Sequence, residues 1–138
     1  GAVELLRYIA VDDCGTIINP VIVEGQVHGG IVQGVAAALF EEATYAEDGT
    51  LETSSMINYL VPSAAEFPSF ELDRTVTPST SNPMGVKGIG EAGTIGSTPA
   101  VINAIVNALG HLGITDIAMP AKPERVWQAI QDANGDAS

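Results

Sequence analysis

A carboxylate surrounded by glycines is the clearest chemical feature of the sequence. Residues 85–96 read GVKGIGEAGTIG, with Glu91 between Gly90 and Ala92. Small neighbours leave a side chain accessible, and glycine lets the backbone bend sharply. The segment could therefore present one carboxylate to a bound molecule. The competing interpretation is an ordinary solvated acid in a surface loop.

The same segment contains a GxGxxG pattern, formed by Gly88, Gly90 and Gly93. In dinucleotide-binding folds such glycines follow directly from a buried strand. Here the preceding residues read TPSTSNPM, and their prolines argue against a central strand. Dinucleotide binding, with Asp116 near the position expected for a ribose ligand, is therefore an alternative and not the first expectation.

Other polar side chains have roles that the sequence leaves open. Lys87 could pair with the nearby carboxylate or bind an anion, or it could be an ordinary exposed lysine. Gln33 carries an amide that suits the edge of a pterin or purine, or simply solvent. His28 and His111 lack a second ligand at helical spacing, so we expect no metal ligand in this chain. Cys14 is expected to be a small buried residue.

Glycines also interrupt a segment that is otherwise predicted to be helical. Each costs about 1 kcal/mol relative to alanine inside a helix, so something must require the missing side chains. Either another backbone approaches closely, or a bulky cofactor contacts one face. The four positions are Gly25, Gly29, Gly30 and Gly34. A membrane helix is excluded because polar residues leave no apolar stretch of about 20 residues.

The composition predicts one globular domain, residues 1–138, with a real hydrophobic core. Hydrophobic residues make up 46% and charged residues only 16%, which suggests a surface partly covered by a partner. A net charge of −12 with only five Lys and Arg argues against nucleic acid and anionic membranes as partners. The single cysteine suits a reducing cytoplasm. The first residue is not methionine, which predicts a processed chain or a fragment.

Periodicity and capping signals predict the elements that must position these side chains. We expect strands over 2–11 and 70–76, and a hairpin turning at Asp48–Gly49 with its second strand over 51–53. Three helices are expected. Their predicted bounds are 20–42, with Asn19 as N-cap; 99–109, with Thr98 as cap, Pro99 at its start and Gly110 as left-handed stop; and 123–132, with Val126, Trp127 and Ile130 facing inward. The fold class is α+β, with a two-layer arrangement in which two long helices cover one face of a mixed β-sheet.

Three blocks of the sequence together resemble one known family. They read VDDCGTIINPVIVEGQVHGGIVQGVAAALFEE, then GVKGIGEAGTIGSTPAVINAI, then ITDIAMPAKPERVWQAI. In this order they resemble the C-terminal part of the molybdopterin-binding large subunit of the xanthine oxidase family. The resemblance covers nearly the whole chain and is greatest to large subunits of the carbon monoxide dehydrogenase and aldehyde dehydrogenase type. It implies a molybdenum-dependent oxidoreductase and a fold of the molybdenum cofactor-binding domain type.

The resemblance also implies roles for individual residues. Glu91 matches the active-site glutamate of the family's KGxGE segment, which acts as general base. Lys87, Gly88 and Gly90 match the rest of that segment. Gln33 matches the pterin-contacting glutamine of a GGxxQG segment. The other matched positions of that segment are Gly29, Gly30 and Gly34.

Cofactors and partners follow from the same resemblance. It implies molybdopterin with molybdenum, in the cytosine dinucleotide form, and FAD and 2Fe-2S clusters on partner subunits. The rest of the large subunit would complete the site, and the chain alone is expected to self-associate. The sequence EAG after the active-site carboxylate departs from the proline pair of xanthine-type members, so an aldehyde, carbon monoxide or an N-heterocycle is a better expected substrate than a purine. A non-catalytic binding or assembly module with the same fold is the remaining alternative.

Overall fold

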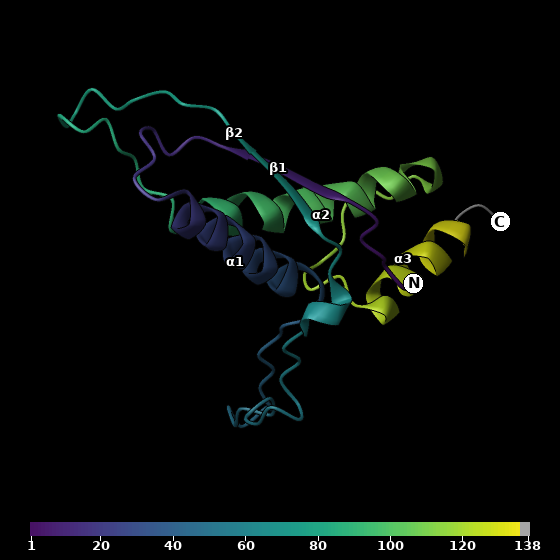
Figure 1. The fold of residues 1–138 in the computed structure, drawn as a ribbon. Coiled ribbons are helices and arrows are strands. Elements are labelled where there is room, and N and C mark those ends of the chain that lie inside the picture. Colours follow the sequence, from purple (N-terminus) through teal and green to yellow (C-terminus); the bar gives the residue numbers. More distant parts are fainter. Residues whose placement is uncertain (136–138) are drawn as a thin grey trace.

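A computed structural model describes residues 1–135 and has two long helices beside a small sheet (Figure 1). The strands are β1 (Tyr8–Asp12) and β2 (Phe70–Arg74), and the helices are α1 (Pro20–Leu39), α2 (Ala92–Leu109) and α3 (Pro123–Gly135). Two short 3₁₀ turns, η1 (Ala64–Glu66) and η2 (Gly110–Leu112), complete the described elements. The predicted α+β class is confirmed.

The sheet has two parallel strands, and this corrects the predicted mixed sheet. Tyr8 pairs with Phe70 and Asp12 pairs with Arg74. The predicted hairpin forms only an isolated bridge between Tyr45 and Leu51 and does not join the sheet. Parallel strands need a long crossover, which α1 and the chain after it provide.

Helix α1 begins where its cap predicts. The Asn19 side chain accepts hydrogen bonds from the backbone N–H groups of Val21 and Ile22, and Pro20 stands at the first helical position, where no donor is needed. The helix ends at Leu39, three residues before the predicted end at 42.

Helices α1 and α2 run parallel and pack closely. Gly30 and Gly34 of α1 lie against Gly93 and Ser97 of α2, and a Cβ at Gly30 would stand 3.0 Å from the backbone nitrogen of Thr94. Close packing is therefore confirmed as the reason for these two helical glycines. The buried core extends from this crossing and includes Val27, Ile31, Val35, Leu39, Val101, Ile105, Ile114, Ile117 and Val126.

Helix α2 begins seven residues before the predicted start at 99. Thr98 and Pro99 lie inside it, and Thr98 donates to the carbonyl oxygens of Gly34 (3.2 Å) and Thr94 (3.3 Å) instead of capping. The first turns of α2 pack against α1, and this packing outweighs the helix-start signal of Thr98 and Pro99. Gly110 has a right-handed conformation with φ −59°, so the prediction that it would be a left-handed helix stop was wrong.

Helix α3 is fastened to the end of α1 by charged side chains. Glu42 accepts hydrogen bonds from Lys122, at 2.7 Å, and from Arg125. Val126 is buried as predicted, but Trp127 is 52% exposed, which corrects its predicted inward orientation. Ile130 is partly buried against the same core, as predicted, together with Ala129 and Ala133.

Residues 43–62 form an arm that projects away from the helices and the sheet (Figure 1). It exposes several large apolar side chains, namely Met56, Ile57, Leu60 and Val61. At its base, the Tyr59 hydroxyl donates to the Glu41 carboxylate at 2.9 Å. The arm therefore leaves and rejoins the molecule at one place.

Candidate functional site

Four element ends gather at one end of the molecule. Because β1 and β2 are parallel, their carboxyl ends lie together. Both long helices begin towards the same end of the molecule, where the start of α2 packs beside residues 27–31 of α1 (Figure 1). Loops after β strands and helix N-termini are common places for ligand binding in α/β structures. Two segments singled out by the sequence meet here. They are the glycine-rich stretch 85–91, called the glycine loop below, and helix α1 with its glycines.

Glu91 stands at the N-cap position of α2, whereas the predicted helix over 99–109 would leave it in a loop, seven residues before the predicted cap at Thr98. Its backbone carbonyl accepts from the N–H of Ile95 at 3.0 Å, but its side chain makes no capping hydrogen bond. The side chain is exposed. A negative charge at a helix N-terminus is favourable. The carboxylate is thus held by its backbone in a fixed place while its oxygens face outward.

The glycine loop before Glu91 is fastened to the end of β1. The Lys87 backbone N–H donates to the Cys14 carbonyl at 2.8 Å, and the Thr16 N–H donates to the Gly85 carbonyl at 3.0 Å. A Cβ on Gly88 would meet no atom within 4 Å, so one side of the loop is open. Gly85, with φ +68°, takes the left-handed conformation that glycine favours.

The lysine of the loop pairs with an aspartate that the sequence pattern did not single out. The Lys87 ammonium donates to the Asp13 carboxylate at 3.2 Å. Hydrogen bonds from Thr77 and from the Gly15 N–H hold the pKa of Asp13 well below its usual range. The open question about Lys87 is thus answered by an ion pair with Asp13, and not with Glu91.

The helical glycines divide into two faces. Gly30 and Gly34 are buried against α2, so their small size serves the helix crossing. Among the described residues, no atom beyond the adjacent helix backbone lies within 4 Å of a Cβ position at Gly25 or Gly29, so both face open space. Of the glycines in the GGxxQG segment, only Gly29 is therefore open to a further molecule.

Two glutamines share the open face with Gly29. The Gln33 side-chain oxygen accepts from the Thr94 hydroxyl at 3.1 Å, three residues after Glu91. Gln26 was missed by the sequence analysis, and its amide nitrogen lies 3.9 Å from the Cβ position of Gly90. Residues 26, 29 and 33 are spaced by three and four, so they form one stripe along α1.

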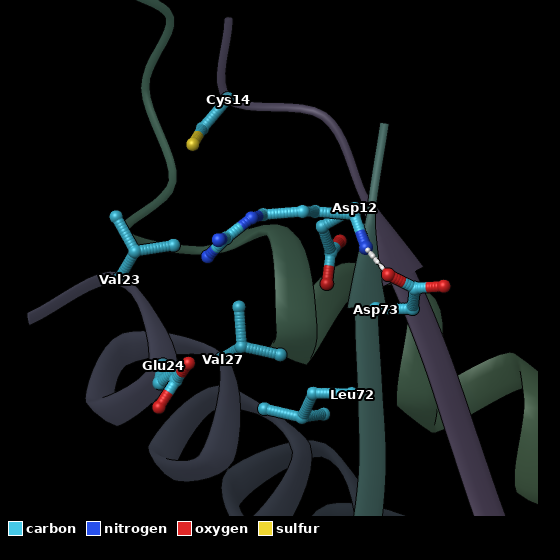
Figure 2. Close-up of a pocket in the computed structure, with 8 residues that line it drawn as sticks. Asp12, Cys14, Val23, Glu24, Val27, Leu72 and Asp73 are labelled. Atoms are coloured by element: carbon cyan, nitrogen blue, oxygen red, sulfur yellow. Dashed lines mark hydrogen bonds between the residues drawn. The ribbon is translucent and has the colours of Figure 1, made fainter. Parts of the chain in front are cut away.

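Cavities flank this region. One of about 250 Å³ lies beside Lys87 and is lined mainly by apolar side chains, including Ile18, Ile22, Val86 and Ile89. Another of about 230 Å³ lies between α1 and the strand ends. Figure 2 shows it with Asp12, Cys14, Val23, Glu24, Val27, Leu72 and Asp73 around it. Cys14 is buried and is a free thiol, as predicted.

Neither of these cavities is lined by Glu91. Among residues 1–135, no group of three or more His, Cys, Asp or Glu side chains is placed to hold a metal ion. Within the same range, none of the helices combines the length and apolar character needed to cross a bilayer.

The arrangement does not match a dinucleotide-binding fingerprint. The first two glycines precede α2, but Gly93 lies inside the helix and packs on α1. The residues before Gly88 form no described strand; β2 ends at Arg74. A strand leading directly into the glycines, which that fingerprint requires, is therefore missing from the described part of the chain.

Comparison with known proteins agrees with the resemblance of the three sequence blocks. A family model described as the molybdopterin cofactor-binding domain matches residues 1–68. The carbon monoxide dehydrogenase large chain of Hydrogenophaga pseudoflava is 41% identical over 134 residues, which cover 97% of this chain and 17% of that relative. The chain belongs to the xanthine oxidase family.

Further members of this family show how far the similarity extends. The nicotine 6-hydroxylase large subunit of Paenarthrobacter nicotinovorans is 44% identical over 131 residues, which cover 95% of this chain and 16% of that subunit. The solved structure of reconstituted CO dehydrogenase from Oligotropha carboxidovorans matches with a TM-score of 0.91 and 40% identity, over 96% of this chain and 16% of that chain. The chain therefore spans about one sixth of the length of the relatives it matches.

Proposed function

We propose that this chain forms one wall of the molybdenum cofactor site in the large subunit of a molybdenum hydroxylase, with Glu91 as its general base. The observation that carries the proposal is the position of Glu91. Its carboxylate is exposed, makes no capping hydrogen bond and lies at the N-terminus of α2 beside the open face of α1. The proposed substrate is an aldehyde, carbon monoxide or an N-heterocycle.

The residues on this face fit a flat polar cofactor. Gly29 and Gly88 leave space where a side chain would stand, and Gly90 has only the Gln26 amide near its Cβ position. The amides of Gln26 and Gln33 can each donate and accept hydrogen bonds, as the edge of a pterin requires. We propose that these five residues hold molybdopterin, in its cytosine dinucleotide form.

The matched positions Lys87, Gly30 and Gly34 support the site in another way. Lys87 fixes the loop through its ion pair and its backbone hydrogen bond. Gly30 and Gly34 let α2 approach α1, which sets the place of Glu91 relative to the glutamines. We propose that their contribution to cofactor binding is this positioning.

The chemistry divides between cofactor and protein. When bound, the molybdenum cofactor supplies the oxidation chemistry and takes up the electrons from the substrate. Glu91 accepts the proton that the nucleophile releases, at its carboxylate oxygens. A positioned general base of this kind is worth about 10²- to 10⁴-fold in rate. The helix backbone holds the carboxylate without using its oxygens, which leaves them available for the proton.

The rest of the large subunit is the proposed partner that closes the site. Support comes from Glu91, which stands on the surface and lines neither cavity near the glycine loop. We further propose iron-sulfur and flavin subunits, carrying 2Fe-2S clusters and FAD, as acceptors of the electrons. A cytoplasmic location is proposed because the one cysteine is a free thiol.

The test is to purify the full-length large subunit with its partner subunits and to measure molybdenum and pterin content. Oxidation of carbon monoxide, benzaldehyde and nicotine is then followed with an electron-accepting dye. We expect stoichiometric molybdenum and turnover of at least one of these compounds. A complex that assembles correctly but holds no molybdenum would show that the chain is a non-catalytic module of the same fold.

A further inference from the structure

The carboxylate of Asp13 joins three separate segments of the chain. Its Oδ1 atom accepts from the Gly15 N–H at 2.8 Å, from the Thr77 N–H at 3.2 Å and from the Lys87 ammonium at 3.2 Å. Its Oδ2 atom accepts from the Thr75 hydroxyl at 3.4 Å. One side chain, directly after β1, therefore fixes the turn after β1, the chain after β2 and the start of the glycine loop.

The glycine loop needs such a fixed point. Between Lys87 and Glu91 lie Gly88 and Gly90, and glycine restricts the backbone less than any other residue. On the far side of Glu91, the loop is held by α2, where Gly93 packs against α1. On the near side, it is held at Lys87. The place of Glu91 thus depends on two anchors, and Asp13 provides the side-chain part of one of them.

We propose that Asp13 is a positioning residue for Glu91, acting through Lys87 and the glycine loop. The inference rests on the proposed function, in which Glu91 is the general base. None of the described hydrogen bonds joins Asp13 to Glu91 or to the open face of α1. Its effect on catalysis is therefore indirect, through the backbone that carries Glu91.

The carboxylate is suited to this role by its charge. Hydrogen bonds from Thr77 and the Gly15 N–H hold the pKa of Asp13 well below its usual range. Asp13 is therefore ionised at neutral pH, where lysine is cationic. The Lys87 and Asp13 side chains are 36% and 23% exposed, so the pair is partly shielded from water.

Two substitutions interrupt the link from opposite sides. Asp13→Asn keeps a side-chain oxygen for the backbone N–H groups but removes the charge that Lys87 meets. Lys87→Met removes the same ion pair from the lysine side, and the lysine side chain is more exposed than that of Asp13. It therefore tests the link even if the Asp13→Asn protein does not fold. Lys87→Arg keeps the cation and serves as the conservative variant. Glu71→Gln is the matched control, because it breaks the exposed Arg7–Glu71 pair of the same sheet.

The first measurement is backbone amide exchange in the full-length large subunit. We expect Asp13→Asn and Lys87→Met to speed exchange about tenfold or more over residues 85–91, as local opening becomes easier. Exchange in α2 should stay unchanged, and Glu71→Gln should change neither segment. Unchanged exchange over 85–91 in both variants would overturn the proposal.

The second measurement is kcat in the assembled holoenzyme, for whichever of carbon monoxide, benzaldehyde and nicotine it oxidises. A misplaced group can lower the rate by about 10²-fold, so we expect a 10- to 100-fold loss in both variants. Molybdenum content should be unchanged, and Lys87→Arg should restore most of the rate. Equal losses of molybdenum and rate would overturn the proposal in favour of a purely structural role.

A double variant separates this inference from the proposed function. If Asp13 acts through Glu91, adding Asp13→Asn to Glu91→Gln should lower kcat no further. Additive losses would overturn the positioning role while leaving Glu91 as the base. Full turnover in Glu91→Gln alone would instead overturn the proposed function, on which the inference depends.

Discussion

Gly34 of α1 stands so close to Ser97 of α2 that a Cβ on Gly34 would lie 1.9 Å from the serine hydroxyl oxygen. Ser97 is fully buried, so its side chain has no space into which it could move. The same Cβ would lie 2.8 Å from the Thr94 carbonyl oxygen, which is backbone and cannot rotate away. The distance between the two helices is therefore set by the absence of a side chain at one position.

Substitution of Gly34 by alanine should destabilise the fold. The added methyl group forces the helices apart, and overpacking of this kind typically costs about 1–3 kcal/mol. Gly25→Ala is the control, because Gly25 meets nothing within 4 Å and alanine gains up to about 1 kcal/mol in a helix. Urea unfolding followed by circular dichroism measures both. Equal stability of the two variants would contradict the close approach at Gly34.

Glu91→Gln should abolish most turnover while leaving the cofactor in place. Glutamine keeps the size and polarity of the side chain but cannot accept the proton. The expected loss is about 10²- to 10⁴-fold, or roughly 3–5 kcal/mol of barrier. Molybdenum content is measured beside the rate in the holoenzyme. Near-normal turnover with full molybdenum would assign the glycine loop to packing alone.

The two glutamines of the open face should affect cofactor retention before they affect the rate. Gln33→Ala and Gln26→Ala each remove an amide, and one lost hydrogen bond lowers affinity by about tenfold. Activity should fall in proportion to molybdenum content. Gln128→Ala, on exposed α3, is the matched control and should retain the cofactor. Full retention in both test variants would place the cofactor elsewhere.

The Glu42 pairs should make part of the stability sensitive to acid. Hydrogen bonds from Lys122 and Arg125 lower the pKa of Glu42 in the folded chain. Their stabilisation is fully present above the unfolded-state pKa of about 4.3 and is lost as the pH falls through the lower folded-state pKa. Glu42→Gln should therefore destabilise the chain at pH 7 and lose less stability than wild type on acidification. The free energies of unfolding of wild type and Glu42→Gln are compared by urea titration at pH 7 and below about pH 4.

The 138-residue chain by itself should self-associate and bind no molybdenum cofactor tightly. Ile18, Val21 and Ile22 are 71%, 77% and 62% exposed around the start of α1, and such grouped apolar side chains favour association. Val21→Ser should shift the chain towards monomer in light scattering. A wild-type monomer that carries stoichiometric molybdenum in metal analysis would contradict both expectations.

Elements with strong local signals could be predicted from the sequence. Asn19 and Pro20 located the start of α1, and Pro123 located the start of α3. The start of α2 could not be found in this way, because Thr98 and Pro99 imitate a helix start. What extends α2 backwards is the contact of Gly93 with α1, and no local pattern contains that contact.

The sequence proposes Glu91 as the central residue of the site but does not indicate its surroundings. Glycine neighbours and the family resemblance singled out Glu91, while its place at a helix N-terminus came only from the structure. Gln26 and Gln33 are seven residues apart on one helix, so periodicity could not tell them apart. Asp13 and Lys87 are 74 residues apart, and it is the bridge between Gly15 and Val86, beyond the paired strands, that brings their loops together.

The arm of residues 43–62 offers a place for insertion that leaves the helix crossing untouched. Its two ends are joined at the base by the Tyr59–Glu41 hydrogen bond, and its tip turns at Gly49, whose φ is +85°. Loop tips of this kind tolerate added sequence well. A fluorescent label or affinity tag inserted after Gly49 would report on assembly from the arm, which projects away from the helices and the sheet (Figure 1).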